Sequence, residues 1–296
     1  MLYPNFDELV QLRSKAAQSK LTFKQKVKSS MTGDYLSTFS GQGMEFDEVR
    51  KYVIGDDIRK IDWRITARVG TPHIKLFKED RQLDVLLCVD MNYTMRFGTR
   101  GTFKSVQAAY CAAILGWCAN NNNDAVGAYL FGDLAEKEVF FRAKRSRHSL
   151  WKMLQTLSQP NESIGNGYIP LSEPVEFLHK NAKSGSLVFI ISDFLNIDDK
   201  FQHQLSYLAR RCQVILISVN DPADMDIPKA GNILFAANER QMLHISTDSE
   251  GGRKAYRDQW QENRSKLDEI TANLGIKTIV IRTNQDVYYD LFLGLK

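Results

Sequence analysis

The sequence predicts an α/β protein in which a doubly wound, mostly parallel β-sheet is flanked by helices. From residue 83 onward, short apolar runs of strand length alternate with longer helical stretches, as in βαβ units. Two of these runs, residues 85–89 and 187–192, show little polar alternation and therefore fit strands covered on both faces. Each run is followed at once by an aspartate, Asp90 or Asp193, at the edge where open α/β sheets bind ligands.

Length and composition fit a globular, cytoplasmic protein. The chain has 296 residues, enough for one large or two ordinary domains, and its 43% hydrophobic and 25% charged residues are ordinary values. Its longest apolar runs are too short to cross a bilayer, and its first residues lack the layout of a signal peptide. The net charge of +4 (39 minus 35) does not indicate nucleic-acid binding by itself. The four cysteines have no paired spacing, which argues against zinc and disulfides.

We expect residues 1–82 to form an N-terminal helix and a small β-rich accessory module. Residues 5–18 place apolar side chains at helical spacing, with Asp7 and Glu8 early and cations late, which suits the helix dipole. Residues 33–80 instead combine glycines, aromatic and β-branched residues and charges, which favours short strands and turns.

Residues 83–296 are expected to form the main α/β domain. The stretch 103–119 carries an apolar face and is the expected helix after the first strand. A second strand is expected at 124–131, paired in a hairpin with 138–142, and residues 221–245 read as an insertion with short strands. The other expected strands are 187–192, 214–219 and 276–281, and the other expected helices are 147–157, 172–180, 200–211, 253–274 and 287–293.

Oxygen-bearing side chains gather after the first strand of this domain. Asp90, Asn92 and Thr94 stand at alternate positions, an arrangement that can direct their oxygens toward a hard cation such as Mg²⁺. If the two aspartate-ending strands are neighbours, Asp193 meets Asp90 across a crevice, and two such carboxylates repel unless a cation or proton lies between them. The alternative is that these residues only cap loops by hydrogen bonding to backbone.

Two kinds of protein carry such an arrangement. Phosphatases of the haloacid-dehalogenase type have Asp-x-Asp-x-Thr after their first strand, and the first aspartate attacks phosphorus. A phosphatase using Asp90 is therefore one alternative, although Asn92 stands at the second acidic position and cannot act as a general acid or base. The von Willebrand factor A fold has Asp-x-Ser-x-Ser and a later aspartate, which hold Mg²⁺ for binding a partner's carboxylate.

A block of residues upstream of the first strand favours the von Willebrand factor A fold over the phosphatase. It comprises residues 43–52, Gly55-Asp-Asp-Ile-Arg-Lys-Ile-Asp-Trp63, 66–68 and 75–79. In order and spacing it resembles the signature of the bacterial domain-of-unknown-function family fifty-eight (DUF58), which joins such a block to a von Willebrand factor A-like domain. Further landmarks that look like those of the family are Lys104, 123–127, 192–194 and 220–222.

The resemblance implies a non-enzymatic protein–protein interaction or adaptor module that acts with a MoxR-type AAA+ ATPase in the assembly or maturation of client proteins. It also implies a degenerate metal-ion-dependent adhesion site for Mg²⁺, made of Asp90, Asn92, Thr94 and Asp193. Binding of Mg²⁺ there is expected to be weak or absent, because asparagine and threonine replace the two serines. Asn166 is the nearest oxygen-bearing residue where the family has its distant threonine, and we expect it to contact a partner.

The upstream block supplies further expected partner-binding residues, namely Arg50, Arg59 and Arg68. The alternative is that these arginines pair with nearby aspartates in a charged network that locks the module onto the main sheet.

Other function classes receive less support. The five histidines are scattered, which argues against zinc hydrolysis, and Gly165-Asn-Gly lacks the Lys-Ser/Thr ending of a phosphate-binding loop. Basic clusters at 13–28 and 142–148 leave nucleic-acid binding as an alternative, which predicts steeply salt-dependent binding.

Overall fold

A computed structural model describes residues 3–18, 44–79, 83–134, 136, 138–159, 168–238 and 241–295 of the chain. Contacts divide the chain into a main unit, Met1–Lys26 with Leu83–Lys296, and an accessory module, Val27–Gln82. The main unit contains the six-stranded sheet, and the accessory module contains a two-stranded one.

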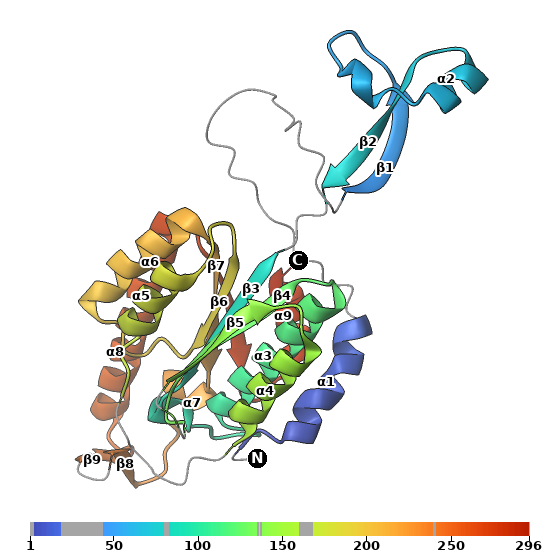
Figure 1. The fold of residues 1–296 in the computed structure, drawn as a ribbon. Coiled ribbons are helices and arrows are strands. Elements are labelled where there is room, and N and C mark those ends of the chain that lie inside the picture. Colours follow the sequence, from blue (N-terminus) through green and yellow to red (C-terminus); the bar gives the residue numbers. More distant parts are fainter. Residues whose placement is uncertain are drawn as a thin grey trace. The chain divides into compact units, whose positions relative to one another are not determined.

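The six-stranded sheet has the order β10-β7-β6-β3-β4-β5 (Figure 1). All neighbours pair in parallel except β4 and β5, which are antiparallel. The strands are β3 (Asp84–Met91), β4 (Ala125–Gly132), β5 (Glu138–Lys144), β6 (Leu187–Ser192), β7 (Gln213–Asn220) and β10 (Lys277–Arg282). The chain adds strands on one side of β3 and then returns to add β6 on the other, so the switch point lies between β3 and β6. The expected α/β class with a mostly parallel sheet is confirmed.

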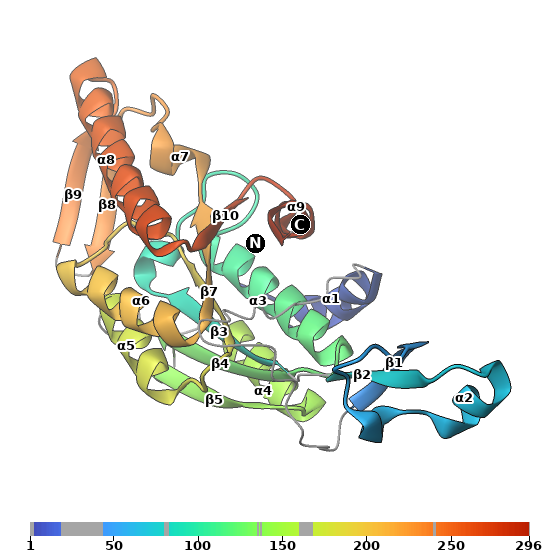
Figure 2. The same cartoon turned by 90° about the horizontal axis from the view of Figure 1, so that it is seen from above.

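Helices cover both faces of this sheet (Figures 1 and 2). One face packs against α1, α3, α4 and α9, and the other against α5, α6 and α8. These helices are α1 (Phe6–Gln18), α3 (Lys104–Asn121), α4 (Arg147–Ser158), α5 (Ser172–Asn181), α6 (Asp199–Arg211), α8 (Glu250–Leu274) and α9 (Val287–Leu295). Among the helices that the structure describes, none has an apolar stretch long enough to span a membrane.

Strand β3 shows why its sequence lacks polar alternation. Val85, Leu87 and Val89 belong to the core on the α3 side. Leu86 and Cys88 belong to the opposite core, which packs against α5 and α6. Because successive side chains of a strand point to opposite faces and both faces are covered, all five residues are buried.

The N-terminal helix belongs to the main unit, which corrects the expected grouping of residues 1–82. Leu9 and Ala16 of α1 are buried in the core that also contains α3. The indole Nε1 of Trp117 in α3 donates to the carbonyl of Leu9 at 3.0 Å. The apolar stripe of residues 5–18 predicted a helix correctly, but such a stripe does not identify the surface that it covers.

The accessory module contains a helix that the sequence pattern did not indicate. Its elements are β1 (Met44–Lys51), η1 (Ile58–Lys60), α2 (Trp63–Val69) and β2 (His73–Glu79), with β1 and β2 antiparallel. Asp62 caps α2 by accepting from the backbone N–H groups of Arg64 and Ile65, and Gly70 ends it in the left-handed conformation at φ 75°. Seven residues are too few to show a clear helical period, which explains the omission.

The segment after β7 forms the expected insertion. It begins with α7 (Pro222–Met225), whose first turn is closed by a capping box between Asp221 and Asp224. The strands β8 (Asn232–Asn238) and β9 (Gln241–Ser246) then pair antiparallel in a separate two-stranded sheet.

Candidate functional site

The candidate site lies at the carboxyl edge of the sheet, where β3 and β6 end side by side. Because the strand order reverses between them, this is the position where α/β sheets bind ligands. The parallel register sets Val89 opposite Ile191, so the residues that follow, Asp90 and Ser192, come together. Ser192 Oγ donates to Asp90 Oδ2 at 2.6 Å, and Asn92 N donates to Asp90 Oδ1 at 2.8 Å. Asp90 is buried, and both of its oxygens have donors.

A buried lysine supplies positive charge to this edge. Lys104, the first residue of α3, is fully buried. Its Nζ lies 2.9 Å from Asp193 Oδ2 and 3.3 Å from Asp224 Oδ1. Asp193 directly follows β6 and accepts a further hydrogen bond from Leu195 N at 3.2 Å, whereas Asp224 lies in α7. We call Asp90, Lys104, Asp193 and Asp224 the sheet-edge cluster.

Burial and neighbouring charges shift the proton affinities within the cluster. Burial raises the pKa of Asp90 to about 7, with a smaller contribution from the charge of Asp193, while hydrogen bonds to its oxygens act in the opposite direction. Burial alone would lower the pKa of Lys104, but Asp193 and Asp224 outweigh it and raise that pKa, so the ammonium stays charged. Burial raises the pKa of Asp224 against the opposing charge of Lys104. Asp193 and Asp224 therefore share one buried cation, and Asp90 lies close enough to be affected by the charge of Asp193.

Asn92 is engaged by the backbone of Ile169, which differs from the ligand role expected for it. Its Oδ1 accepts from Ile169 N and its Nδ2 donates to Ile169 O, both at 3.0 Å. Both residues are buried. The amide thus satisfies two backbone groups that would otherwise be buried without partners, and it holds the segment before α5 against the end of β3.

Replacing Asn92 with alanine is expected to lower the free energy of unfolding by about 1–3 kcal/mol, because the N–H and C=O of Ile169 lose their partners. Hydrogen exchange of the Ile169 amide should accelerate in the variant. The matched control is Asn284→Ala, which changes an exposed asparagine. An unchanged exchange rate at Ile169 would show that the Asn92 side chain does not hold the Ile169 backbone in place.

The remaining expected site residues of the main unit are Thr94, a metal ligand, and Asn166, a partner contact. Thr94 lies half-buried in η2 (Tyr93–Met95), and within the described part of the chain its hydroxyl makes no hydrogen bond to Asp90 or Asp193. Asn166 lies outside the described residues.

The backbone turns sharply after Asp193. Phe194 has φ 53°, a left-handed conformation that is uncommon for a bulky residue. It is held there by burial of its ring, which lies 6.2 Å from the ring of Phe201, and by donation from its N–H to Ser192 Oγ at 3.2 Å. A strained residue kept in place by its surroundings is a common feature of functional sites.

A fourth carboxylate, Asp221, connects the loops around the cluster. It accepts from Thr99 N at 2.8 Å and Thr99 Oγ1 at 2.5 Å, in the loop before α3. It also accepts from Thr283 Oγ1 at 2.6 Å, at the end of β10. Burial alone would raise the pKa of Asp221, but these hydrogen bonds lower it on balance. The charged carboxylate therefore fixes the loop that leads into Lys104.

Arg264 brings another cation to the same edge from α8. Its Nη1 donates to Ser218 Oγ in β7 at 2.9 Å, and its guanidinium lies 5.4 Å from the centre of the Trp260 ring. Burial lowers the pKa of Arg264, while the charges of Asp268, Asp224 and Asp193 act in the opposite direction. The guanidinium is thus held by polar, aromatic and charged neighbours together.

No sequence motif indicated that Lys104, Asp224 or Arg264 belongs to the site. For Lys104 a signal was present, because it is the only charged residue in α3. No local pattern distinguishes Asp224 or Arg264, since their partners, Lys104 and Ser218, come from distant parts of the chain.

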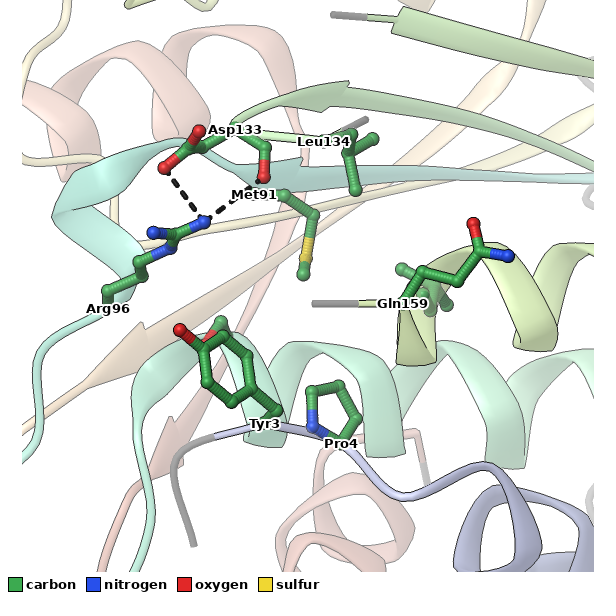
Figure 3. A pocket seen from close by; sticks show the side chains of 9 residues that line it. Tyr3, Pro4, Met91, Arg96, Asp133, Leu134 and Gln159 are labelled. Atoms are coloured by element: carbon green, nitrogen blue, oxygen red, sulfur yellow. Dashed lines mark hydrogen bonds and ion pairs between the residues drawn. The ribbon is translucent and has the colours of Figure 1, made fainter. Parts of the chain in front are cut away.

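A pocket lies beside the cluster on the α3 side of the sheet edge, between β3, β4 and the N-terminal segment (Figure 3). Figure 3 shows Arg96 directed toward Asp133, with Arg96 Nη2 2.8 Å from Asp133 Oδ2. Tyr3, Pro4 and Met91 line the pocket beside this pair. The cavity holds about 20 Å³, which is room for a single water molecule and not for a small-molecule substrate.

The expected partner-binding arginines of the accessory module fall into two groups. Arg50 makes a two-point ion pair with Asp56, with distances of 2.8 Å and 2.7 Å, so it serves the structure of the module itself. Arg59 and Arg68 are exposed, and within the described residues no acid forms an ion pair with either.

Fold and site together define an α/β protein with a helix-flanked, mostly parallel sheet and a buried charge cluster at its switch point. The chain belongs to the family described as "Protein of unknown function DUF58", whose model matches residues 48–266. The uncharacterized proteins Mb1516 of Mycobacterium bovis and Rv1480 of Mycobacterium tuberculosis are each 28% identical to it over 273 residues, or 92% of this chain and 85% of theirs. The crystal structure of the conserved hypothetical protein BatB from Bacteroides thetaiotaomicron is 15% identical, covers 72% of this chain and 95% of that chain, and has a TM-score of 0.44, too low to establish a shared fold.

Proposed function

We propose that this chain is a non-enzymatic protein–protein interaction module of the von Willebrand factor A-like type. In this proposal it acts as an adaptor for a MoxR-type AAA+ ATPase in the assembly or maturation of client proteins. The observation that carries the proposal is an exposed segment of the accessory module, residues 53–69, which presents apolar and basic side chains together. We call it the module segment.

The apolar side chains of the module segment are unusually open to solvent. Ile54 is 96% exposed and Trp63 is 66% exposed, and helix α2 has no buried residue at all. A short helix normally buries an apolar face, so one that does not bury any residue has an unsatisfied surface. The other exposed large apolar residues of the segment are Val53, Ile58 and Val69. Tryptophan and arginine are the residues that most often dominate protein–protein interfaces.

The exposed arginines of the module segment suit an acidic partner. Residues 53–69 contain four basic and three acidic residues. The three acids are used locally, because Asp56 pairs with Arg50 and because Asp57 and Asp62 accept from backbone N–H groups at the starts of η1 and α2. Exposed arginines of the segment therefore face solvent without a neutralising carboxylate among the described residues. An acidic surface on the ATPase would supply complementary charge. These arginines are Arg59, Arg64 and Arg68.

The surroundings of Asp90 favour this proposal over a phosphatase. A nucleophilic carboxylate must reach phosphorus, whereas Asp90 is 3% exposed and both of its oxygens accept hydrogen bonds. The residue two positions later, Asn92, is occupied with the backbone of Ile169.

Basic residues of the cluster at 13–28 also make structural contacts, which weakens the nucleic-acid alternative. In α1, the guanidinium of Arg13 lies 5.9 Å from the centre of the Trp117 ring, and Lys15 Nζ lies 3.6 Å from Asp286 Oδ2. Both contacts help to hold α1 on the main unit. The rest of the cluster, from residue 19 to 28, lies outside the described residues.

Trp63→Ser should weaken binding of the full chain to a purified MoxR-type ATPase from the same organism by about 10- to 100-fold, because a large exposed anchor is removed. Arg68→Glu should have a similar effect and reduce the salt dependence of association. The matched control is Tyr289→Ser, which removes a 64% exposed aromatic residue from α9 of the main unit. Titration calorimetry measures the affinity of each of the three variants for the ATPase. An equal loss of affinity in the control and in the module variants would contradict the proposal.

A further inference from the structure

The magnesium site that the family resemblance implies does not fit the residues at the sheet edge. Mg²⁺ requires oxygen ligands in a near-octahedral arrangement and is usually bound by carboxylates together with water. Here Asp193 Oδ2 is bonded to the ammonium of Lys104, and the side-chain oxygen of Asn92 accepts from Ile169 N. A fixed positive charge 2.9 Å from the proposed ligand oxygen would repel a second cation.

We propose that the Lys104 ammonium permanently takes the place of a divalent cation at this sheet edge, so that the cluster is complete without metal. The ammonium touches Asp193 after β6, one of the two expected acidic ligands, and also Asp224 in α7. The other expected acidic ligand, Asp90, accepts from Ser192 Oγ and Asn92 N instead. It thereby joins α3, the end of β6 and α7 at one point.

The coordination of the ammonium is consistent with this role. Lys104 Nζ donates one hydrogen bond to Asp193 Oδ2 and one to Asp224 Oδ1. The face of the Phe97 ring lies on another side, with its centre 5.5 Å from Nζ, which adds a cation–π contact. An ammonium has three N–H donors and no acceptor, so these neighbours satisfy most of its bonding capacity without water.

Burial distinguishes this arrangement from an open adhesion site. Lys104 is 0% exposed, and Asp193 and Asp224 are 5% and 2% exposed. An adhesion-type cation must keep a position open for the carboxylate of a partner, whereas here the cation is tethered to α3 and enclosed. A partner therefore cannot be bound through a bridging metal at this edge. The cluster instead connects α3, the end of β6 and α7 inside the main unit.

The test removes the tethered cation and asks whether a free one replaces it. Mn²⁺ serves as the probe, because it takes oxygen ligands and its binding can be followed by electron paramagnetic resonance. The native chain is expected to bind no Mn²⁺ at the cluster up to about 1 mM metal. Lys104→Ala is expected to bind it and to gain about 3–6 °C in Tm at saturating metal. Combining Asp193→Asn with Lys104→Ala should abolish both the Mn²⁺ binding and the gain in Tm.

A second lysine variant serves as the control. Lys183→Ala removes a lysine from a surface pair with Asp84 and should neither bind Mn²⁺ nor change in Tm when metal is added. If Lys104→Ala is unfolded without metal, Mn²⁺ should restore its circular dichroism spectrum. Failure of metal to bind or to rescue the variant would overturn the proposal. So would Mn²⁺ binding by the native chain that Asp193→Asn removes.

Discussion

Replacing Lys104 with methionine is expected to lower the free energy of unfolding by about 3–5 kcal/mol. Methionine matches the length and volume of the lysine stem but carries no charge. The substitution leaves the carboxylates of Asp193 and Asp224 buried side by side without their shared cation. Removing one partner of a buried ion pair is costly, because the remaining charge can neither reach water nor find another partner.

Urea denaturation of the full chain measures this loss. The matched control is Lys183→Met, which removes a cation from an ion pair with Asp84 at 2.8 Å. Because the Lys183 side chain is 76% exposed, this pair should contribute only about 0–1 kcal/mol. Equal losses in the two variants would show that Lys104 has no special place in the stability of the main unit.

Asp90 should make the native chain less stable as the pH rises toward and past neutrality. Its pKa is raised from 3.8 to about 7 by burial and, secondarily, by the charge of Asp193. The folded state therefore binds a proton more tightly than the unfolded state does. The resulting stability is fully present below the unfolded pKa and is lost as the pH rises through the folded pKa. Between about pH 4 and pH 8 the contribution falls by about 2–4 kcal/mol.

Asp90→Asn should remove this pH dependence, because the amide cannot titrate. The difference in free energy of unfolding between the variant and the native chain should therefore shift in favour of the variant by that amount as the pH rises. Asp199→Asn controls for the loss of one charge, since it changes a fully exposed aspartate at the start of α6. Parallel stability curves for the native chain and Asp90→Asn would show that Asp90 does not titrate in this range.

The strands of the main sheet could be predicted because each is an uninterrupted apolar run. In β3, residues from Val85 to Val89 alternate between two covered faces, so neither face requires polar side chains. The same reasoning placed Asp90 and Asp193 each at the end of a strand but left open whether the two strands are neighbours. The parallel pairing of β3 with β6 and the hydrogen bond between Ser192 and Asp90 show that these strand ends meet.

Long-range partners could not be predicted in the same way. The stripe of α1 indicated burial, but its packing on α3 is shown by long-range contacts such as the bond from Trp117 to Leu9. Asn92 looked like a metal ligand by its spacing, yet its partner Ile169 lies 77 positions away. Lys104 stood out as a landmark of the family resemblance and as the lone charge of α3, but no residue near it in the sequence identifies its two carboxylate partners.

Anomalous scattering can show whether the sheet edge is closed by the Lys104 ammonium or by a metal ion. Crystals of the native chain grown with Mn²⁺ would be examined for anomalous scattering near Asp90, Asp193 and Asp224. We expect no anomalous peak there and a Lys104 Nζ within hydrogen-bonding distance of Asp193 and Asp224. A manganese ion bonded to Asp90 or Asp193, with Lys104 displaced toward solvent, would contradict this expectation.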